Sequence, residues 1–444
     1  MLNMDNNTEH DARVRALADE LRTRVAGPAH IEKGGVHHVV PLPGDKRFVG
    51  KPVDISSLRC ILSIDPVAAT CVAEPGVTFA EIVRATLPFG LIPAVVPELE
   101  GITLGGAVAG CSVESMSYRF GGFHDTCLEY EVLSGAGEAL ILSPSQNAEL
   151  FHMTHGSYGT LAILTKLTFK LVPAKPYVRM EYRRLDSYPG FEAELQARCA
   201  AEDFDFVDAI VHGPHTFVLC LGRFVDTAPY VSSYRGSEIF YKSTRLRDED
   251  YLTTFDYCFR YDTECHWLTR TVPPLEWRPV RRVLGKVFLG STNLIKWSHR
   301  LEPLLKLKKR PDVVVDVFIP VRRLRAFWEW YAAEMRFYPL WMVPYRVPTP
   351  YPWIDPRHQA QMEGGLVIDC AVYGKRNQDP AVDWSRVLEE KTYELGGIKT
   401  LISRNHHSRD QFWKIYHREA WTRAKVRLDP TGAFPDLYDK FHRA

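Results

Sequence analysis

Four glycines fall within ten residues at the start of the segment GITLGGAVAGCSVES, residues 101–115. The residues between them are small or apolar, and glycine lets a backbone approach a bulky ligand without a Cβ in the way. If a turn begins at Thr103, its free N–H groups would make an anion site of the kind that binds pyrophosphate. Tight packing of a helix built from small residues explains the pattern equally well.

Two further glycine-containing loops lie between expected regular elements, EKGGVHHVVP at 32–41 and HGSYGTLAI at 155–163. Three such loops within about 130 residues fit one extended ligand, and a dinucleotide has that size. The glycine segments contain neither the G-x-x-x-x-G-K-[ST] pattern of a Walker loop nor the G-x-G-x-x-G pattern of a Rossmann turn. The sequence therefore predicts a dinucleotide site of another kind.

The chain has 444 residues, so we expect two or three domains. Its 55 basic and 54 acidic residues nearly cancel, which gives no reason to expect a nucleic-acid partner. None of the nine cysteines forms a C-x-x-C pair, a pattern typical of reduced thiols in the cytoplasm. No zinc, calcium or hydrolase motif is present, and we predict no metal site.

Periodicity divides the chain at Pro173 and Pro176. Before them, the patterns predict a helix at 11–26, hairpins at 60–74 and 126–142, and a long strand at 160–173. They also predict a helix at 78–90, which a capping box begins at Thr78. After them, strands interleave with helices and predict an antiparallel sheet with helices on one face. The strand candidates are 206–212, 216–222, 312–319, 340–346 and 365–373, and the helix candidates are 189–201, 321–337, 382–395 and 408–424.

The motifs KGGVHH, VDISSL, VAEPGVTFAEI, VPELEGITLGGAVAG, SYRFGGFHD and GSYGTLAILTKLTFKLVP carry a family resemblance. They resemble the PCMH-type FAD-binding domain of the vanillyl-alcohol-oxidase superfamily. Later patches, among them FYPLWMVPYRVP, IDCAVYG and GAFPDLYDKFHRA, are similar to delta-24 sterol reductases, so the likeness covers most of the chain. It implies an α+β protein: an FAD-binding domain of two α/β subdomains (11–175), a cap with an antiparallel sheet flanked by helices (176–395), and a C-terminal segment that returns to the first domain (396–444).

The resemblance also implies a set of contacts to FAD. Many relatives link the flavin covalently to a histidine in the first glycine loop, where His37 and His38 stand, but the reductase branch lacks this link, so we expect non-covalent FAD. The implied contacts are Gly34, Gly35 and His37 in the first loop; Thr103, Leu104, Gly105, Gly106, Gly110, Cys111, Ser112 and Ser115 in the second; and Gly121, Gly122, Thr160 and Ile163 beyond it.

The implied activity is that of an FAD-dependent oxidoreductase that reduces a carbon–carbon double bond of a hydrophobic lipid or isoprenoid, with NADPH as electron donor. An FAD oxidase or dehydrogenase of an alcohol or sugar is the first alternative. A non-catalytic lipid-binding protein and a membrane-recruited partner protein are the others. The membrane-anchoring N-terminal helix of animal and plant sterol reductases is missing, so we expect a cytoplasmic protein, free or peripheral at a membrane.

Protonation of an alkene needs an acid, and the sequence offers several candidates. FRYDTECHW at 259–267 contains Tyr261 and Asp262, and the resemblance places Glu114 near the flavin ring and Lys425 near its N1–C2 edge. Each of these also fits an ordinary structural role. We interpret Tyr373 and Asp369 as a core tyrosine and an edge aspartate.

Residues 272–310 combine ten Lys and Arg with two Glu and interleaved Trp, Leu, Val and Phe. Such a segment is suited to contact with an anionic membrane, from which a lipid substrate could be taken. A solvated basic face over a core helix is the alternative. Oligomeric state is left open.

Overall fold

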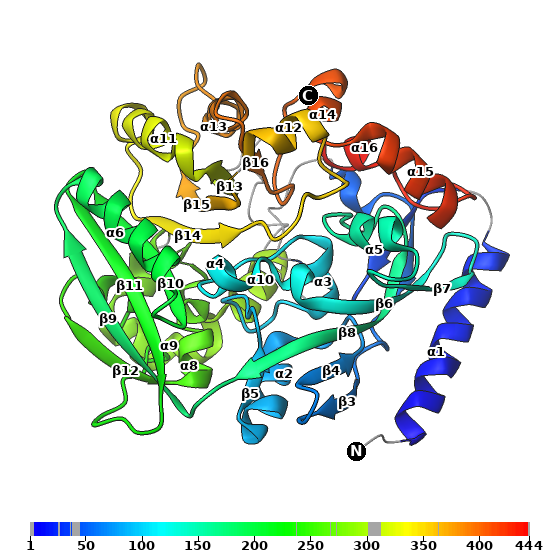
Figure 1. The fold of residues 1–444 in the computed structure, drawn as a ribbon, viewed down its shortest axis with the longest axis horizontal. Coiled ribbons are helices and arrows are strands. Elements are labelled where there is room, and N and C mark those ends of the chain that lie inside the picture. The colour runs from blue at the N-terminus through cyan, green and yellow to red at the C-terminus, as the bar shows by residue number, and fades with distance from the viewer. Residues whose placement is uncertain are drawn as a thin grey trace.

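The computed structural model describes residues 4–24, 27–35, 37, 45–236, 238–266, 268–271, 273–300, 312–362 and 364–442. The chain forms two lobes, each built on a sheet (Figure 1). This mixed architecture confirms the predicted α+β fold. No helix among the described residues is long and apolar enough to cross a membrane.

The first lobe contains a sheet of order β3-β4-β8-β6-β7, and a short strand, β5, also pairs with β8. The predicted hairpins and the long strand are confirmed, and Thr78 begins its helix with a capping box to Glu81. The elements are α1 (Met4–Thr23), β1 (Ala29–Glu32), β2 (Lys51–Asp54), β3 (Ile61–Asp65), β4 (Thr70–Ala73), α2 (Phe79–Thr86), β5 (Leu91–Pro93), α3 (Leu104–Ala109), α4 (Ser117–Phe120), β6 (Cys127–Leu133), β7 (Ala139–Leu142), α5 (Ala148–Thr154) and β8 (Ile163–Pro173).

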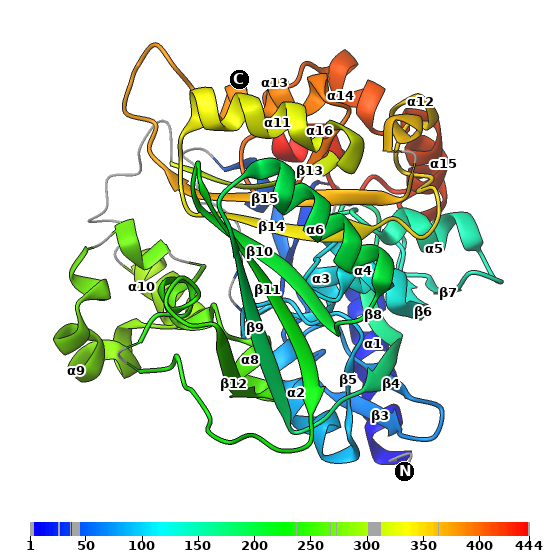
Figure 2. The same ribbon diagram turned by 60° about the vertical axis from the view of Figure 1, so that its left-hand side comes forward.

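The second lobe is an eight-stranded antiparallel sheet of order β12-β9-β11-β10-β14-β15-β13-β16. Figure 2 shows α6 and α11 on one face, as predicted, with α3 and α4 on the other side. The strands are β9 (Tyr177–Leu185), β10 (Phe206–Gly213), β11 (Thr216–Val225), β12 (Glu249–Thr253), β13 (Val313–Pro320), β14 (Leu340–Arg346), β15 (Leu366–Lys375) and β16 (Ile398–Lys399). The helices are α6 (Tyr188–Ala201), α7 (Phe240–Ser243), α8 (Thr254–Cys258), α9 (Arg278–Phe288), α10 (Ser291–Arg300), α11 (Leu324–Trp330), α12 (Pro356–Gln359) and α13 (Trp384–Glu394).

Alternation along β13 and β15 assigns their side chains to two cores. Val315 and Val317 of β13, like Cys370 of β15, pack under the covering helices. The residues between them point to the opposite face, because successive side chains of a strand alternate. Asp316 pairs in register with Ala371, and Asp369 pairs with Phe318, so both aspartates lie on the face that looks toward the first lobe.

The C-terminal segment returns to the first lobe. Its helices are α14 (Arg409–Ile415), α15 (Arg418–Leu428) and α16 (Leu437–Phe441), so the single helix predicted at 408–424 is in fact two helices. Helix α15 packs against α5, and Figure 1 shows these last helices (red) beside it. Gly135 N–H donates to the Leu428 carbonyl at 2.7 Å, and Ala29 N–H donates to the Ala433 carbonyl at 2.7 Å.

A buried guanidinium joins the lobes. Arg260, which follows α8, donates to Glu114 of the first lobe at 2.8 Å and lies 3.3 Å from Asp208 of β10. Asp208 also accepts from Tyr261 at 3.1 Å and from the indole of Trp341 at 2.8 Å. All of these side chains are buried. The contact between the lobes therefore includes an ion network with little access to water.

Replacing Arg260 with Met should destabilise the protein by about 3–5 kcal/mol, because two carboxylates would stay buried without their cation. Chemical denaturation measures the change. Arg179→Ala is the control: it removes an exposed pair with Glu249 and should cost less than about 1 kcal/mol. Equal losses in the two variants would contradict a special role for Arg260.

Candidate functional site

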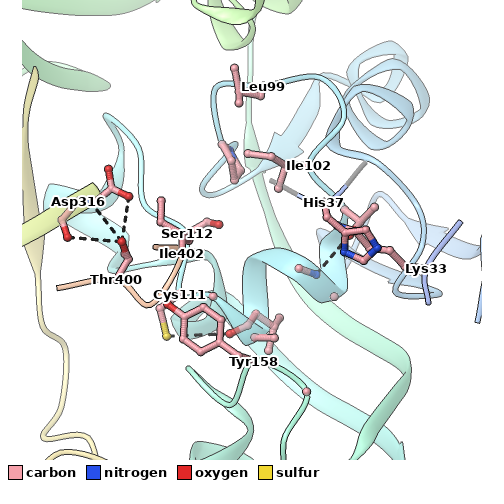
Figure 3. A pocket seen from close by; sticks show the side chains of 18 of the residues that line it. Lys33, His37, Leu99, Ile102, Cys111, Ser112, Tyr158, Asp316, Thr400 and Ile402 are labelled. Carbon is pink, nitrogen blue, oxygen red and sulfur yellow. Dashed lines mark hydrogen bonds between the residues drawn. The ribbon is translucent and has the colours of Figure 1, made fainter. Parts of the chain in front are cut away.

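A cavity of about 640 Å³ lies between the lobes, within the size range of ligand sites. Its walls come from the segments 97–113 and 154–164 of the first lobe, the inner face of β13–β15, and the C-terminal residues Lys440 and Phe441. Most of the lining is apolar. In Figure 3, Lys33 and His37 lie at one end, Asp316 and Thr400 lie at the other, and Cys111, Ser112 and Tyr158 stand between them.

Helix α3 begins where the glycine segment predicted a turn. Thr103 is its N-cap, and its hydroxyl accepts from Gly106 N–H at 3.4 Å. The N–H groups of Leu104 and Gly105 donate to the carbonyls of Val77 and Pro75, each at 2.9 Å. The expectation of free N–H groups at this turn is therefore wrong, because all three are already paired within the protein.

The two glycines at this turn have different environments. A Cβ on Gly105 would lie 2.6 Å from the Cβ of Pro75, so Gly105 permits close packing within the lobe. A Cβ on Gly106 would lie 3.1 Å from the Thr103 hydroxyl and 3.6 Å from Lys33 Nζ, so Gly106 opens toward an amine of the cavity wall. Close packing therefore explains Gly105, whereas a ligand contact at Gly106 stays a prediction.

Only part of the predicted FAD contacts line the cavity: His37, Thr103, Gly105, Gly106, Gly110, Cys111 and Ser112. Gly34, Gly35, Leu104, Ser115, Gly121, Gly122, Thr160 and Ile163 are not among its lining residues. Cβ atoms on Gly121 and Gly122 would meet Asp125 at 2.5 Å and His124 at 2.4 Å, so these glycines lie against side chains. Ser115 hydrogen-bonds Tyr257 at 3.0 Å, and the Thr160 hydroxyl donates to the Ser157 carbonyl at 2.6 Å.

The four predicted catalytic residues also lie outside the lining. Glu114 and Tyr261 belong to the Arg260 network. Asp262 accepts from the Ser291 hydroxyl at 2.6 Å and from Glu100 N–H at 3.0 Å. Lys425 donates to the carbonyls of Thr160 and Phe434 and pairs with Asp429 at 2.7 Å. Each of these side chains has a structural partner, and their catalytic roles stay predictions.

Two amines that sequence reasoning missed border the cavity. Lys33 Nζ lies 3.5 Å from the Thr103 hydroxyl, and Lys440 Nζ donates to the Tyr158 carbonyl at 2.7 Å. Burial lowers the pKa of each to about 8, because desolvation disfavours the charged form. Lys33 directly precedes the Gly34-Gly35 pair, so its place in that loop was the available signal.

Three carboxyl groups border the opposite part of the cavity. Burial raises the pKa of Glu98 to about 8, that of Asp316 to about 6, and that of Asp369 well above its usual range. Asp316 accepts hydrogen bonds from the hydroxyls of Tyr373 and Thr400. The interpretation of Asp369 as an edge residue is wrong, because β15 lies between β14 and β13. The sequence signal for buried Asp316 and Asp369 was the single Asp inside each of the apolar runs VVVDVFIP and LVIDCAVYG.

A neutral histidine completes this wall. The His266 ring packs 4.2 Å from Trp341, 4.3 Å from Tyr261 and 5.0 Å from Tyr373, measured between ring centroids. Burial lowers the pKa of His266 well below its usual range, so the ring is uncharged at neutral pH. The wall can thus present neutral acids and aromatic surface to a ligand.

One group outside the cavity has the spacing of a metal site. The ligand atoms of His124, Asp125 and His155 lie within 4.8 Å of one another. Asp125 already accepts from Gly122 N–H at 2.8 Å and from the hydroxyls of Tyr351 and Tyr345 at 2.7 and 3.2 Å. Because its carboxylate is engaged in these hydrogen bonds, we assign no metal to the group.

Comparison with known proteins defines the class of this site. Residues 31–143 match the model of the FAD binding domain family, and the chain is an FAD-dependent oxidoreductase. Over 401 residues it is 25% identical to the human Delta(24)-sterol reductase, covering 87% of this chain and 77% of that protein. The corresponding reductase of Arabidopsis thaliana is 25% identical over 437 residues, covering 87% of this chain and 76% of its own. A cytokinin dehydrogenase from rice is 27% identical over 140 residues, which cover 31% of this chain and 27% of the length of that protein. The resemblance inferred from the sequence is confirmed.

Gly106→Val should yield folded protein without FAD, because a branched side chain would project toward Lys33 where the backbone now leaves room. The flavin-to-protein absorbance ratio after purification measures this loss, and thermal unfolding confirms that the variant folds. Gly213→Val is the control: Gly213 is not among the lining residues, the nearest atom to its added Cβ would be the Thr216 hydroxyl at 4.0 Å, and its FAD content should be normal. A normally yellow Gly106→Val protein would remove this turn from the FAD site.

Proposed function

We propose that the protein holds FAD non-covalently in the cavity between the lobes and reduces a carbon–carbon double bond of a hydrophobic lipid or isoprenoid, with NADPH as electron donor. The observation that supports this most is the separation, within one largely apolar cavity, of Lys33 at one end from Asp316 at the other. The relatives named Delta(24)-sterol reductase support the same reaction and suggest a sterol side chain as substrate.

Lys33 and Lys440 would hold the pyrophosphate of FAD, and Gly106, which has no side chain, would leave room for it beside Lys33. An anion favours the charged form of a desolvated amine, and a pyrophosphate supplies charge and acceptor oxygens together. The bound phosphates would in turn favour the protonated amines, whose pKa burial has lowered. His37, at the same end, completes this part of the wall.

The substrate would lie between the apolar loop of the first lobe and the sheet of the second. Leu99 and Ile102 of the first lobe and Val314 and Phe318 of β13 are all part of the cavity lining. These side chains suit a hydrocarbon and exclude water from the reacting carbons. Reduced FAD supplies a hydride to such a substrate. The protein itself must supply the proton, because an isolated alkene is a poor hydride acceptor until it is protonated.

We also propose that the region around α9 contacts a lipid surface. Trp277 and Val283 are 61% and 77% exposed, and Arg278 and Arg282 are exposed beside them. Indole rings and arginines of this kind favour the interface of an anionic membrane. Leu275, two residues before Trp277, lines the cavity, so a lipid could pass from this surface inward. Residues 272 and 301–310 of the predicted segment lie outside the described residues.

Anaerobic mixing with NADPH tests the proposed reaction. NADPH should bleach the yellow protein, and a sterol with a 24(25) double bond, delivered in cyclodextrin, should restore the oxidised spectrum and yield the saturated sterol. Acid denaturation should release the flavin. The saturated sterol is the control, and it should leave the reduced spectrum unchanged. Fast re-oxidation by oxygen with peroxide release, without NADPH consumption, would instead favour an alcohol or sugar oxidase.

Lys33→Met should weaken FAD binding by about 10-fold or more, because a charge-assisted hydrogen bond contributes about 1.5–3 kcal/mol. Titration of the deflavinated protein with FAD, followed by quenching of flavin fluorescence, measures the dissociation constant. Lys170→Met, on an exposed position of β8, should leave that constant unchanged. An unchanged constant in Lys33→Met would place the pyrophosphate elsewhere.

A further inference from the structure

We propose that Asp369 is the acid that protonates the substrate alkene. The Asp316 carboxylate beside it keeps the proton on this acid before the reaction and stabilises the cation that results. This inference rests on the proposed function. It assigns a catalytic role to a pair of residues that lie on neighbouring strands and share one wall of the cavity with Trp341 and Tyr373.

The strand register fixes the pair. Asp316 of β13 is opposite Ala371, and Asp369 is two residues along β15 from Ala371, so the two carboxyls are diagonal neighbours on one face. Both line the cavity, and Glu98 approaches from the loop of the first lobe on the other side. Asp369 is 2% exposed and lies in the interior of the sheet, where neighbouring strands hold its backbone on both sides.

The two aspartates differ in their hydrogen bonds. Asp316 accepts from the hydroxyls of Tyr373 and Thr400, which stabilise its ionised form. Oδ1 of Asp369 is buried and has no hydrogen-bond partner among the described residues. A buried carboxylate oxygen without a donor is very costly, whereas a neutral carboxylic acid at that position costs much less. The geometry therefore divides the pair into an anion, Asp316, and an acid, Asp369.

Electrostatics points the same way. Burial raises the pKa of Asp369 well above its usual range, and the charges of Asp316 and Glu98 add to this effect. Burial raises the pKa of Asp316 only to about 6, because the Tyr373 and Thr400 hydroxyls counteract it. Asp369 is therefore the member of the pair that holds its proton more tightly, and Asp316 is the member that ionises first. Glu98, whose pKa burial raises to about 8, is also mostly protonated and could return a proton to Asp369 after turnover.

The step balances as follows. The O–H bond of Asp369 breaks, and the π electron pair of the alkene forms a C–H bond to the less substituted carbon. This leaves a tertiary cation on the other carbon and a carboxylate on Asp369, and the hydride that the proposed function supplies completes the reduction. The Asp316 carboxylate lowers the energy of the cation, since unlike charges attract strongly in a poorly hydrated wall.

Half-reactions separate this inference from the proposed function. Asp369→Asn should bind FAD and be reduced by NADPH like the wild type, whereas its re-oxidation by the 24(25)-unsaturated sterol should slow about 100-fold or more. Asp369→Glu should restore part of the rate. Re-oxidation of Asp369→Asn at the wild-type rate would overturn the inference alone. Failure of the wild type itself to bind FAD or accept electrons from NADPH would instead overturn the proposed function.

The state of the acid can be read without turnover. The infrared difference spectrum between wild-type holoenzyme and Asp369→Asn at neutral pH should contain the carbonyl stretch of a protonated carboxylic acid. Carboxylate bands alone would overturn the assignment. This measurement needs no substrate, so it holds whichever lipid the protein reduces.

The pH dependence tests the role of Asp316. Among the described residues, the titratable groups near Asp369 on this wall include Asp316, Glu98, Tyr373, His266 and the thiol of Cys265. The acid acts when protonated, so wild-type re-oxidation should slow as pH rises through the pKa of Asp369. Asp316→Asn removes a negative neighbour of Asp369, so the fall in the re-oxidation rate should move to lower pH. The same variant should bind a lipophilic tertiary amine, which mimics the cation, more weakly. An unchanged pH profile and unchanged amine binding would overturn the role of Asp316.

Discussion

The buried guanidinium of Arg260 is the interaction on which the arrangement of the two lobes depends. An unpaired charge in such a place would be prohibitively costly, so Arg260 needs both Glu114 from the first lobe and Asp208 from the second. That requirement sets the distance between the segment that follows α3 and the sheet. Trp341 of β14 donates a hydrogen bond to Asp208 and also lines the cavity, so the same network fixes one wall of the site.

Local patterns predicted the local structure well. The capping box at Thr78, the hairpins of the first lobe and five strands of the second sheet, β10, β11, β13, β14 and β15, are visible in short windows of sequence. Strand β9 was missed, although its burial alternates at Val178, Met180 and Tyr182. The charged residues between them masked this period of two, and they lie exposed or half-buried on the other face. The break between α14 and α15 was missed because both helices follow one continuous polar and aromatic pattern.

The site was less predictable, for two physical reasons. A glycine pattern shows where the backbone is free of side chains but not what approaches it, and here Gly105 packs on Pro75 whereas Gly106 opens toward an amine. The charged residues of the cavity depend on pairing between strands that are far apart in sequence. Asp316 and Asp369 become neighbours only through the register of β13 and β15, and Glu98 joins them only when the lobes meet. No local pattern contains that information.

The distribution of charge in the cavity fits a reaction in which a proton and a hydride reach neighbouring carbons. Amines and carboxyl groups at close range would neutralise one another as ion pairs, and the acid would then lose its proton. The apolar lining separates Lys33 from the aspartates, as Figure 3 shows for Asp316. Separation keeps Lys33 available to phosphate, and burial favours the neutral form of the Asp369 carboxyl group. The distance between the two charge types is thus as important to the chemistry as the residues themselves.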